Sequence, residues 1–327
     1  MRSLTKRTLT SDQLSALLRA SAGTGCRVEA ELTDGWFNAA YRVRLDDGRP
    51  AVVKVAPPPE AAVLRYERGI MATEIMVHRR AAALDGVPLP ELLHAGPDFM
   101  ALSVLPGTPW DKADDRLPPG RQPALRRELG RIAARLHTLT SQDGRYGYPA
   151  PEAGLSAADW PSAFAAMVEA MLEDAVRWHS PLGVPAEEIR ELVAAGAPAL
   201  ARVDRPRLVH FDLWPGNVFV SGDGTAVTGL IDHERAFFGD PAAELVSLGL
   251  GGDTGPDSDL VAGYREAGGH LDFGPGMRQR LALYRLYLGL IIVVECGPRG
   301  YGADHLRSCR AALARWTDEA RAAAAAC

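Results

Sequence analysis

Two short segments of the chain carry the side chains whose types and spacing could do chemistry. The first contains His210, Asp212 and Asn217, and the second places Asp232 fifteen residues after Asn217. Each lies beside a run of β-forming apolar residues, and the end of a strand can hold polar groups over a cleft. Asp212 could accept the proton of a hydroxyl group, while the oxygens of Asn217 and Asp232 are ligands that Mg²⁺ prefers. The pattern predicts a phosphoryl-transfer site.

The order and spacing of these residues match those of a kinase catalytic loop. There, His-x-Asp-x-x-x-x-Asn supplies the base and one metal ligand, and a later aspartate supplies the other ligand. For each residue alone a turn is the commoner role, since Asp and Asn are frequent in turns. The combination favours catalysis. We interpret Asp212 as the base, Asn217 and Asp232 as metal ligands, and His210 as a structural residue that braces the loop.

The residues after Asp232 extend this site. On an extended segment, alternate side chains point to opposite sides. We therefore expect Glu234 to lie on the side of Asp232, where it could contact the metal or the substrate. His233 is expected to face the other way.

A lysine inside an apolar strand is the second signal. Only three of the 36 Lys and Arg residues are lysines, and Lys54 is flanked by Val53 and Val55. The phosphates of ATP and a helix glutamate would balance its charge, as in the strand-lysine and helix-glutamate pair of kinases. Of Glu67 and Glu74, we choose Glu74 because it lies nearer the middle of the helix predicted to follow. The alternative is a solvent-facing lysine on an edge strand.

The elements that must position these residues begin with a small sheet. Residues 25–105 predict about five antiparallel strands and one long helix over 60–84. A short opening helix over 11–20 precedes them, capped by Ser11 or Asp12. The predicted strands of this part are 28–32, 41–45, 51–55, 89–94 and 99–105.

The rest of the chain is mostly helical, with short strands around the candidate site at 208–211, 217–221 and 226–231. The predicted helices are 121–140, 159–178, 185–202, 241–250, 258–267, 277–295 and 303–325. We therefore expect an α+β fold with an N-terminal nucleotide-binding lobe over 1–105 and a C-terminal catalytic and substrate-binding lobe over 106–327.

Composition excludes several classes of function. The 327 residues are 47% hydrophobic and 24% charged, as in a globular protein, and the net charge of −5 argues against a nucleic acid as partner. The longest apolar run, 286–294, is too short to span a bilayer and indicates a buried helix. The N-terminus lacks a signal core. The four cysteines show neither C-x-x-C spacing nor a dense disulfide framework, which indicates free thiols. We therefore expect a cytoplasmic protein with no membrane partner.

With these residues assembled, the chain resembles the aminoglycoside phosphotransferase family of bacterial small-molecule kinases, which have the protein-kinase-like fold. The resemblance covers roughly residues 25–295. It rests on short motifs: Asn38-x-x-Tyr41-Arg42-Val43, Val52-Val53-Lys54-Val55, Gly86-Val87-Pro88-Leu89-Pro90, Leu105-Pro106-Gly107, Leu136-His137, the loop from His210 to Asn217, and Ile231-Asp232 with Gly239-Asp240-Pro241. The family usually has His-Gly-Asp in the loop, so Phe211 is a departure that alters the wall behind Asp212.

The resemblance implies roles for further residues. Asp212 would be the base, Asn217 and Asp232 would bind Mg²⁺, and Lys54 with Glu74 would hold the phosphates of ATP or GTP. The Ser103 carbonyl and the Leu105 N–H would bind adenine. Asn38 would join the nucleotide-binding residues, although its loop, 33–41, has a single glycine and the chain has no Walker A motif. Asp240 would brace the catalytic loop.

The acceptor is open at this stage. A hydroxylated antibiotic, such as an aminoglycoside, fits the family, but a polycation calls for an acidic pocket, and residues 241–327 hold ten acids against nine arginines. A primary metabolite is the alternative: a sugar, an amino alcohol such as choline or homoserine, or a fructosamine. A metal-dependent hydrolase that uses His210, Asp212, Asp232 and His233 is a second hypothesis, and a non-catalytic nucleotide-binding module is a third.

Overall fold

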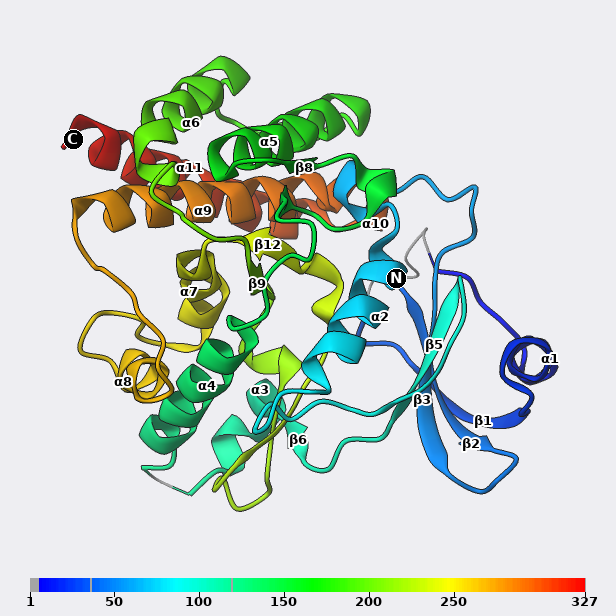
Figure 1. Cartoon of the computed structure of the whole chain (residues 1–327). Coiled ribbons are helices and arrows are strands. Elements are labelled where there is room, and N and C mark those ends of the chain that lie inside the picture. The colour runs from blue at the N-terminus through cyan, green and yellow to red at the C-terminus, as the bar shows by residue number, and fades with distance from the viewer. Residues whose placement is uncertain (1–5, 36, 119, 327) are drawn as a thin grey trace.

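The computed structural model describes residues 6–35, 37–118 and 120–326, which form an α+β fold with a smaller sheet-based lobe and a larger, mostly helical lobe (Figure 1). This confirms the predicted fold class. The boundary at residue 105 stays a prediction.

The smaller lobe is built on a five-stranded antiparallel sheet. In spatial order its strands are β1 (Cys26–Leu32), β2 (Ala39–Leu45), β3 (Pro50–Val55), β5 (Phe99–Ser103) and β4 (Leu92–Ala95). The turn at 46–49 joins β2 to β3, as its Asp-Asp-Gly sequence predicts.

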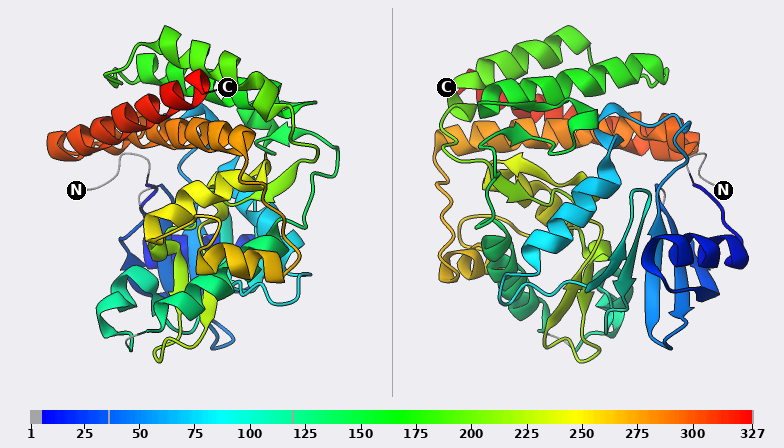
Figure 2. Two further views of the ribbon diagram at one scale, coloured as in Figure 1. Left: turned by 90° about the vertical axis from the view of Figure 1, so that its left-hand side faces the viewer. Right: turned by 45° about the vertical axis from the view of Figure 1, so that its right-hand side comes forward.

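Each face of this sheet is covered by one helix. The α1 helix (Ser11–Ala22) packs Leu14 and Leu18 against one face, together with Val53 and its alternate neighbours on β3. The α2 helix (Ile70–Ala81) packs its Met71 and Ile75 against the opposite face. The right panel of Figure 2 shows α1 and α2 on opposite sides of the strands. Because successive side chains of a strand alternate, Lys54 projects toward α2.

One predicted helix start and one predicted cap were wrong, whereas the predicted start of α1 at residue 11 is confirmed. The helix over 60–84 begins only at Ile70, because Gly69 has φ +71 and the chain before it forms a short 3-10 turn, Arg65–Glu67. A Cβ at Gly69 would lie 2.7 Å from a carboxylate oxygen of Glu152, so the position also excludes a larger residue. The α1 cap is Thr10, whose side chain accepts a hydrogen bond from the backbone N–H of Gln13 in a capping box.

The larger lobe holds the remaining elements. Its helices are α3 (Trp110–Ala113), α4 (Gln122–Leu136), α5 (Trp160–Arg177), α6 (Ala186–Leu200), α7 (Glu244–Leu248), α8 (Asp259–Glu266), α9 (Pro275–Val294), α10 (Cys296–Arg299) and α11 (Ala303–Ala325). Its strands are β6 (Thr108–Pro109), β7 (Tyr146–Gly147), β8 (Ser156–Ala157), β9 (Arg207–Val209), β10 (Val218–Val220), β11 (Val227–Leu230) and β12 (Phe237–Gly239). They pair in the orders β11-β10-β6 and β8-β7-β12-β9. The helix predicted over 241–250 is shorter, because 3-10 turns flank α7.

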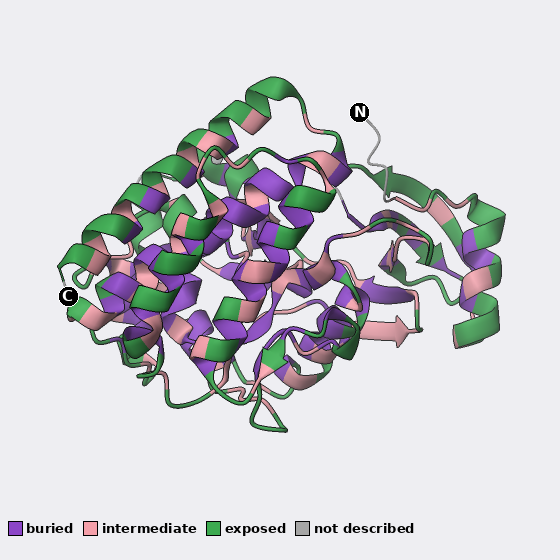
Figure 3. Cartoon of the chain, turned by 90° about the horizontal axis from the view of Figure 1, so that it is seen from above, coloured by how far each residue is buried: buried purple, intermediate pink, exposed green. Residues whose placement is uncertain are grey.

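The α9 helix is the centre of the larger core. Seen from above, buried residues fill the middle of this lobe and exposed residues lie on the outer helix faces (Figure 3). The segment Pro275–Arg299 is long and apolar enough to cross a membrane by composition, but 78% of its most apolar window is buried against the rest of the chain. This matches the buried helix predicted from the apolar run at 286–294.

Candidate active site

Two loops of the larger lobe are fastened side by side at the ends of short strands. The first follows β9, and the second follows β11. The His210 ring nitrogen Nε2 lies 3.1 Å from the Ile231 carbonyl oxygen, and the Ile231 N–H donates to the Asn217 carbonyl at 3.1 Å. His210 therefore bridges the two loops, as its predicted bracing role requires.

A buried carboxylate fixes the backbone of the first loop. Glu244 on α7 accepts hydrogen bonds from the backbone N–H groups of His210, at 2.6 Å, and Phe211, at 3.0 Å. The expectation that Asp240 braces this loop was wrong, because Asp240 forms its hydrogen bonds elsewhere among the described residues: it caps the turn at Pro241–Ala243 and accepts hydrogen bonds from Arg280 and Tyr284. The bracing acid is four residues further along the chain.

Phe211 occupies a backbone conformation that glycine adopts more easily. Its φ is +61, in the left-handed region. The ring is 1% exposed and packs against Phe237 and Tyr287, with centroids 5.2 and 5.8 Å away. Aromatic packing thus offsets a backbone cost of about 1–3 kcal/mol. This explains how the chain departs from the usual His-Gly-Asp and keeps the loop.

Asp212 is held from both sides. Its Oδ2 accepts a hydrogen bond from the Asn217 side-chain amide at 3.0 Å, and its Oδ1 accepts one from Arg235 at 3.0 Å. Burial raises the pKa of Asp212 to about 7, while Arg235 opposes that rise. A carboxylate so held is oriented as a base and titrates near neutral pH.

Lys54 joins the two lobes through two acids. Its Nζ lies 2.7 Å from both carboxylate oxygens of Glu74 on α2 and 2.7 Å from Oδ1 of Asp232 in the larger lobe. Burial lowers the pKa of Lys54, but the two acids outweigh it and the pKa is raised. Lys54 lowers the pKa of Asp232 despite burial, which acts the other way. The ammonium therefore stays charged and Asp232 stays ionised.

The segment after Asp232 turns instead of extending. Asp232 has φ +68, and His233–Arg235 form a 3-10 turn. The extended segment on which we based the expected positions of His233 and Glu234 is therefore absent. Glu234 nevertheless lies close to Asp232, because carboxylate oxygens of Glu74, Asp232 and Glu234 are within 4.8 Å of one another. Asn38 donates from its side-chain amide to Glu234 at 3.1 Å.

His233 points into the core. It is fully buried, and its ring packs against the rings of His78 and His210 with centroids 4.9 and 4.6 Å away. His233 is not among the acidic groups that cluster around Asp232, which argues against the ligand set that the hydrolase hypothesis required.

A chain of buried ion pairs behind Asp212 was missed in the sequence. Arg235 donates to both oxygens of Glu295 at 2.9 Å while it holds Asp212. Glu295 also accepts from Tyr66 at 2.5 Å and pairs with Arg299 at 2.7 Å. Asp212 is thus connected through Arg235 to the end of α9 and to the segment before α2.

The donor set fits a magnesium nucleotide. Both hydrogen bonds of the Asn217 amide to Asp212 use its nitrogen, so its amide oxygen is left for another ligand. With Asp232 it offers the hard oxygens that suit Mg²⁺. Ser103 ends β5, and Leu105 packs against Gly229, where a Cβ would lie 2.3 Å from the leucine side chain. Both residues lie on the connection between the lobes, where the sequence predicts the adenine contacts.

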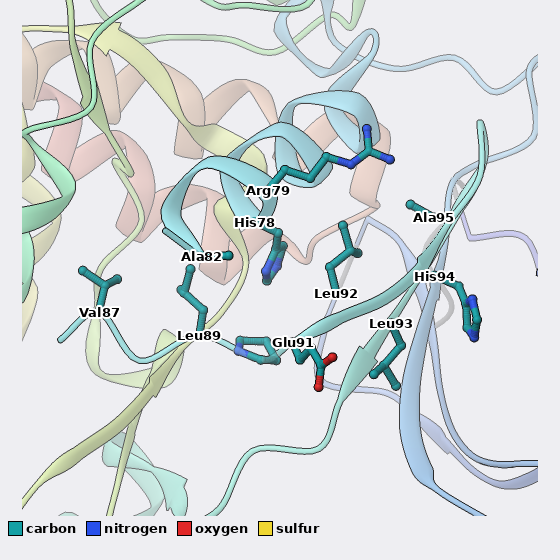
Figure 4. Close-up of a pocket in the computed structure, with 11 residues that line it drawn as sticks. His78, Arg79, Ala82, Val87, Leu89, Glu91, Leu92, Leu93, His94 and Ala95 are labelled. Carbon is teal, nitrogen blue, oxygen red and sulfur yellow. The ribbon is translucent and has the colours of Figure 1, made fainter. Parts of the chain in front are cut away.

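A hollow of about 590 Å³ lies elsewhere, between α2 and the segment 87–95 (Figure 4). His78 and Arg79 project into it from α2, and Leu89 and Glu91 line it from the facing segment (Figure 4). None of the predicted site residues lines it. The hollow is therefore separate from the cluster around Asp212 and Lys54.

Comparison with known sequences identifies the family. Residues 29–284, most of the chain, match the phosphotransferase enzyme family. The chain belongs to this family. The resemblance inferred from the motifs is confirmed.

Two curated proteins that are similar to this chain are named "Probable ketoamine kinase". The one from Lactiplantibacillus plantarum is 39% identical over 83 residues, 25% of this chain and 27% of the relative. The one from Staphylococcus aureus is 26% identical over 183 residues, 52% of this chain and 60% of the relative. The chain thus aligns with between a quarter and three fifths of the length of these relatives.

Solved structures share the fold over nearly the whole phosphotransferase chain. A Thermobifida fusca protein provisionally named fructosamine-3-kinase has a TM-score of 0.69 at 23% identity and covers 96% of this chain and 99% of its own. A macrolide 2'-phosphotransferase from Brachybacterium faecium has a TM-score of 0.58 at 20% identity, with coverage of 92% and 98%. The streptomycin–ATP–APH(2")-IIa complex has a TM-score of 0.60 at 14% identity, with coverage of 94% and 97%. These likenesses show the protein-kinase-like fold.

Proposed function

We propose that the protein is an ATP- and Mg²⁺-dependent kinase that transfers the γ-phosphoryl group to a hydroxyl of a small molecule, with Asp212 as the catalytic base. The convergence of residues from both lobes supports this proposal most. Lys54 of the smaller lobe lies 2.7 Å from Glu74 of the same lobe and 2.7 Å from Asp232 of the larger lobe, and the loop of Asp212 and Asn217 is tied to the segment of Asp232. A structural lysine would need one partner, whereas this one pairs with an acid from each lobe.

The proposed reaction depends on positioning more than on a strong base. Asp212 orients the acceptor hydroxyl and takes its proton as the bond to phosphorus forms, and a carboxylate suffices because the transition state is loose. Lys54, fixed by Glu74, would hold the nucleotide phosphates. Asn217 and Asp232 would hold Mg²⁺, which would neutralise charge that develops on the phosphate oxygens. Ser103, Leu105 and Asn38 would bind the nucleotide, and Glu234 would contact the metal or the acceptor.

For the acceptor, we favour a ketoamine, a sugar derivative joined to an amine, over an antibiotic. Both curated relatives carry that name. An exposed aromatic side chain on the loop of Asp212 fits a sugar: Trp214 is 38% exposed two residues after Asp212 in sequence, and its indole covers Gly216, where a Cβ would lie 2.1 Å from a ring carbon. An exposed aromatic ring offers a flat apolar surface to the carbon face of a sugar. The net charge of −5 and the buried membrane-length helix fit a cytoplasmic enzyme.

Replacement of Asp212 by Asn tests the reaction. We expect a loss of turnover of at least about 100-fold, the low end of what a positioned base contributes, with ATP affinity within a few-fold of wild type. Asp223→Asn is the matched control, because Asp223 is an exposed acid that hydrogen-bonds only its own turn at Ser221 and Thr225. Full turnover in the Asp212 variant would remove its assigned role.

A substrate panel tests the acceptor class. Ketoamines, free sugars, amino alcohols, macrolides and aminoglycosides are incubated with Mg-ATP, and products are detected by mass as phosphate esters. We expect the highest kcat/KM with a ketoamine, and Trp214→Ala should raise the KM for that acceptor while the KM for ATP stays unchanged. A macrolide or an aminoglycoside as best acceptor would contradict the assigned class and leave the kinase proposal intact.

A further inference from the structure

Two thiols and one imidazole converge where α10 and α11 meet, outside the set of residues proposed to bind the nucleotide and the acceptor. Cys296 begins α10, and His305 and Cys309 lie four residues apart on α11. Residues so spaced share one face of a helix. The Sγ atoms of the two cysteines and a ring nitrogen of His305 all lie within 4.8 Å of one another. Two separate helices therefore aim two sulfurs and one imidazole at a single point.

We propose that Cys296, His305 and Cys309 form a binding site for a soft late transition-metal ion, Zn²⁺ or Cu⁺. In a tetrahedral zinc site with Zn–S of about 2.3 Å and Zn–N of about 2.0 Å, neighbouring donor atoms are roughly 3.5–3.8 Å apart. From a separation of at most 4.8 Å, each pair of donors needs to approach by no more than about 1.3 Å to reach that geometry. Three protein ligands leave the fourth position to water, as in zinc sites that keep an open position.

The surroundings of the cluster favour a metal ion that can enter from solvent. Cys296 and Cys309 are 6% and 7% exposed, whereas His305 is exposed. The imidazole therefore stands at the mouth of the site and the thiols at its base. The Tyr301 ring lies edge-on to His305, with centroids 4.6 Å apart, and this contact orients the imidazole. Sulfur and nitrogen donors select Zn²⁺ or Cu⁺ and reject Mg²⁺, so the ion would be separate from the nucleotide metal.

The protonation of the thiols sets the pH dependence of binding. Cys296 donates its S–H to the Ile292 carbonyl oxygen at 3.2 Å. Burial raises the pKa of Cys309 and raises that of Cys296 to about 12. Both sulfurs are therefore protonated at neutral pH, which slows disulfide formation because the thiolate is the attacking species. A metal ion must displace these protons, so its affinity should rise with pH.

Metal titration of the purified full chain, stripped with chelator and kept under reductant, tests the site. We expect one equivalent of Zn²⁺ per chain in competition with a chromophoric chelator, and a thiolate-to-cobalt charge-transfer band when Co²⁺ is used. Cys309→Ser and His305→Ala should each weaken Zn²⁺ affinity by at least about 10-fold, since even the loss of an outer-shell partner costs that much. Excess Mg²⁺ should not compete.

Matched controls keep the result interpretable. Cys26→Ser and Cys327→Ser each remove a thiol that is not among the three ligands, and both should bind Zn²⁺ like wild type. His305 is exposed, so its replacement should leave the fold intact even if Cys309→Ser does not. Wild-type protein that binds no equivalent of Zn²⁺, or binding that survives both Cys309→Ser and His305→Ala, would overturn the proposal.

Discussion

The carboxylate of Asp212 pairs with the buried guanidinium of Arg235. In the proposed mechanism, this pair sets the acidic limb of the pH dependence of kcat/KM. Arg235 contacts Asp212 at 3.0 Å and opposes the rise of its pKa caused by burial. Without that cation, the pKa of Asp212 should rise, and a higher pH is then needed to ionise the base. We predict that Arg235→Gln moves the acidic limb of kcat/KM upward by about one pH unit or more, in line with the effect of an opposite charge at this distance.

The pH profile separates this effect from a loss of stability. Arg280→Gln is the control: Arg280 is likewise a partly buried arginine, paired with Asp240 at 2.7 Å, but it does not contact Asp212. That variant should lose stability and keep the wild-type profile. Arg235→Lys should restore part of the shift. An unchanged acidic limb in Arg235→Gln would show that Arg235 only supports the fold.

The residues that could be predicted from the sequence were those whose type is rare or whose spacing is fixed. Lys54 stood out because lysine is scarce in this chain, and the loop residues stood out by their order. Arg235 carried no such signal, since 33 of the basic residues are arginines and its partner Glu295 is 60 residues away. The role of Glu244 could not be predicted either, because it arises only when α7 packs behind the loop.

Helices α4 and α8 pack unusually closely. A Cβ at Gly263 on α8 would lie 1.8 Å from the Arg127 carbonyl oxygen on α4, and a Cβ at Gly130 on α4 would lie 2.0 Å from the Leu260 carbonyl oxygen. The two helices thus touch through their backbones. We predict that Gly263→Ala lowers the free energy of unfolding by about 2 kcal/mol or more, because overpacking against backbone cannot relax easily.

Chemical denaturation measures this effect, with Gly302→Ala as the control. Gly302 is the N-cap of α11, and a Cβ there meets nothing within 4 Å. Alanine caps a helix less well than glycine does, so this control should lose about 1 kcal/mol or less. Equal stability of both variants would mean that α4 and α8 separate at little cost.

The elements themselves were largely predictable, and the errors have local causes. Strands β2 and β3 alternate buried and exposed residues and flank a hairpin turn, so their sequences carry the pattern. The start of α2 could not be read from helical periodicity, because the pattern continues through Gly69 while the backbone there is left-handed. The turn after Asp232 was missed for the same reason, since a non-glycine residue rarely adopts positive φ.

A buried histidine cluster spans the two lobes and links stability to pH. His78 on α2 packs against His233, and burial lowers the pKa of His78 to about 4. The unfolded chain then binds more protons than the folded one between pH 6.5 and 4. The contribution of His78 is therefore complete above its unfolded pKa of about 6.5 and is lost as pH falls through that window.

We predict that His78→Leu gains about 2 kcal/mol relative to wild type between pH 7 and pH 5, the difference expected for a pKa of about 4 against 6.5. Comparing denaturation of the two proteins at each pH isolates this term from the buried acids, which are present in both proteins. The measurement at pH 8 gives the packing cost of the substitution. A stability difference that does not change with pH would contradict the buried neutral state of His78.

The bridge from Lys54 to Asp232 has a consequence for the molecule at rest. Together with the hydrogen bond from Asn38 to Glu234, it ties the smaller lobe to the larger one at the candidate site. An arriving triphosphate must unlatch Lys54 from Asp232, and the freed carboxylate then repels the phosphates unless a divalent cation enters with them. Nucleotide and cation should consequently bind in a strongly cooperative manner, each poorly without the other.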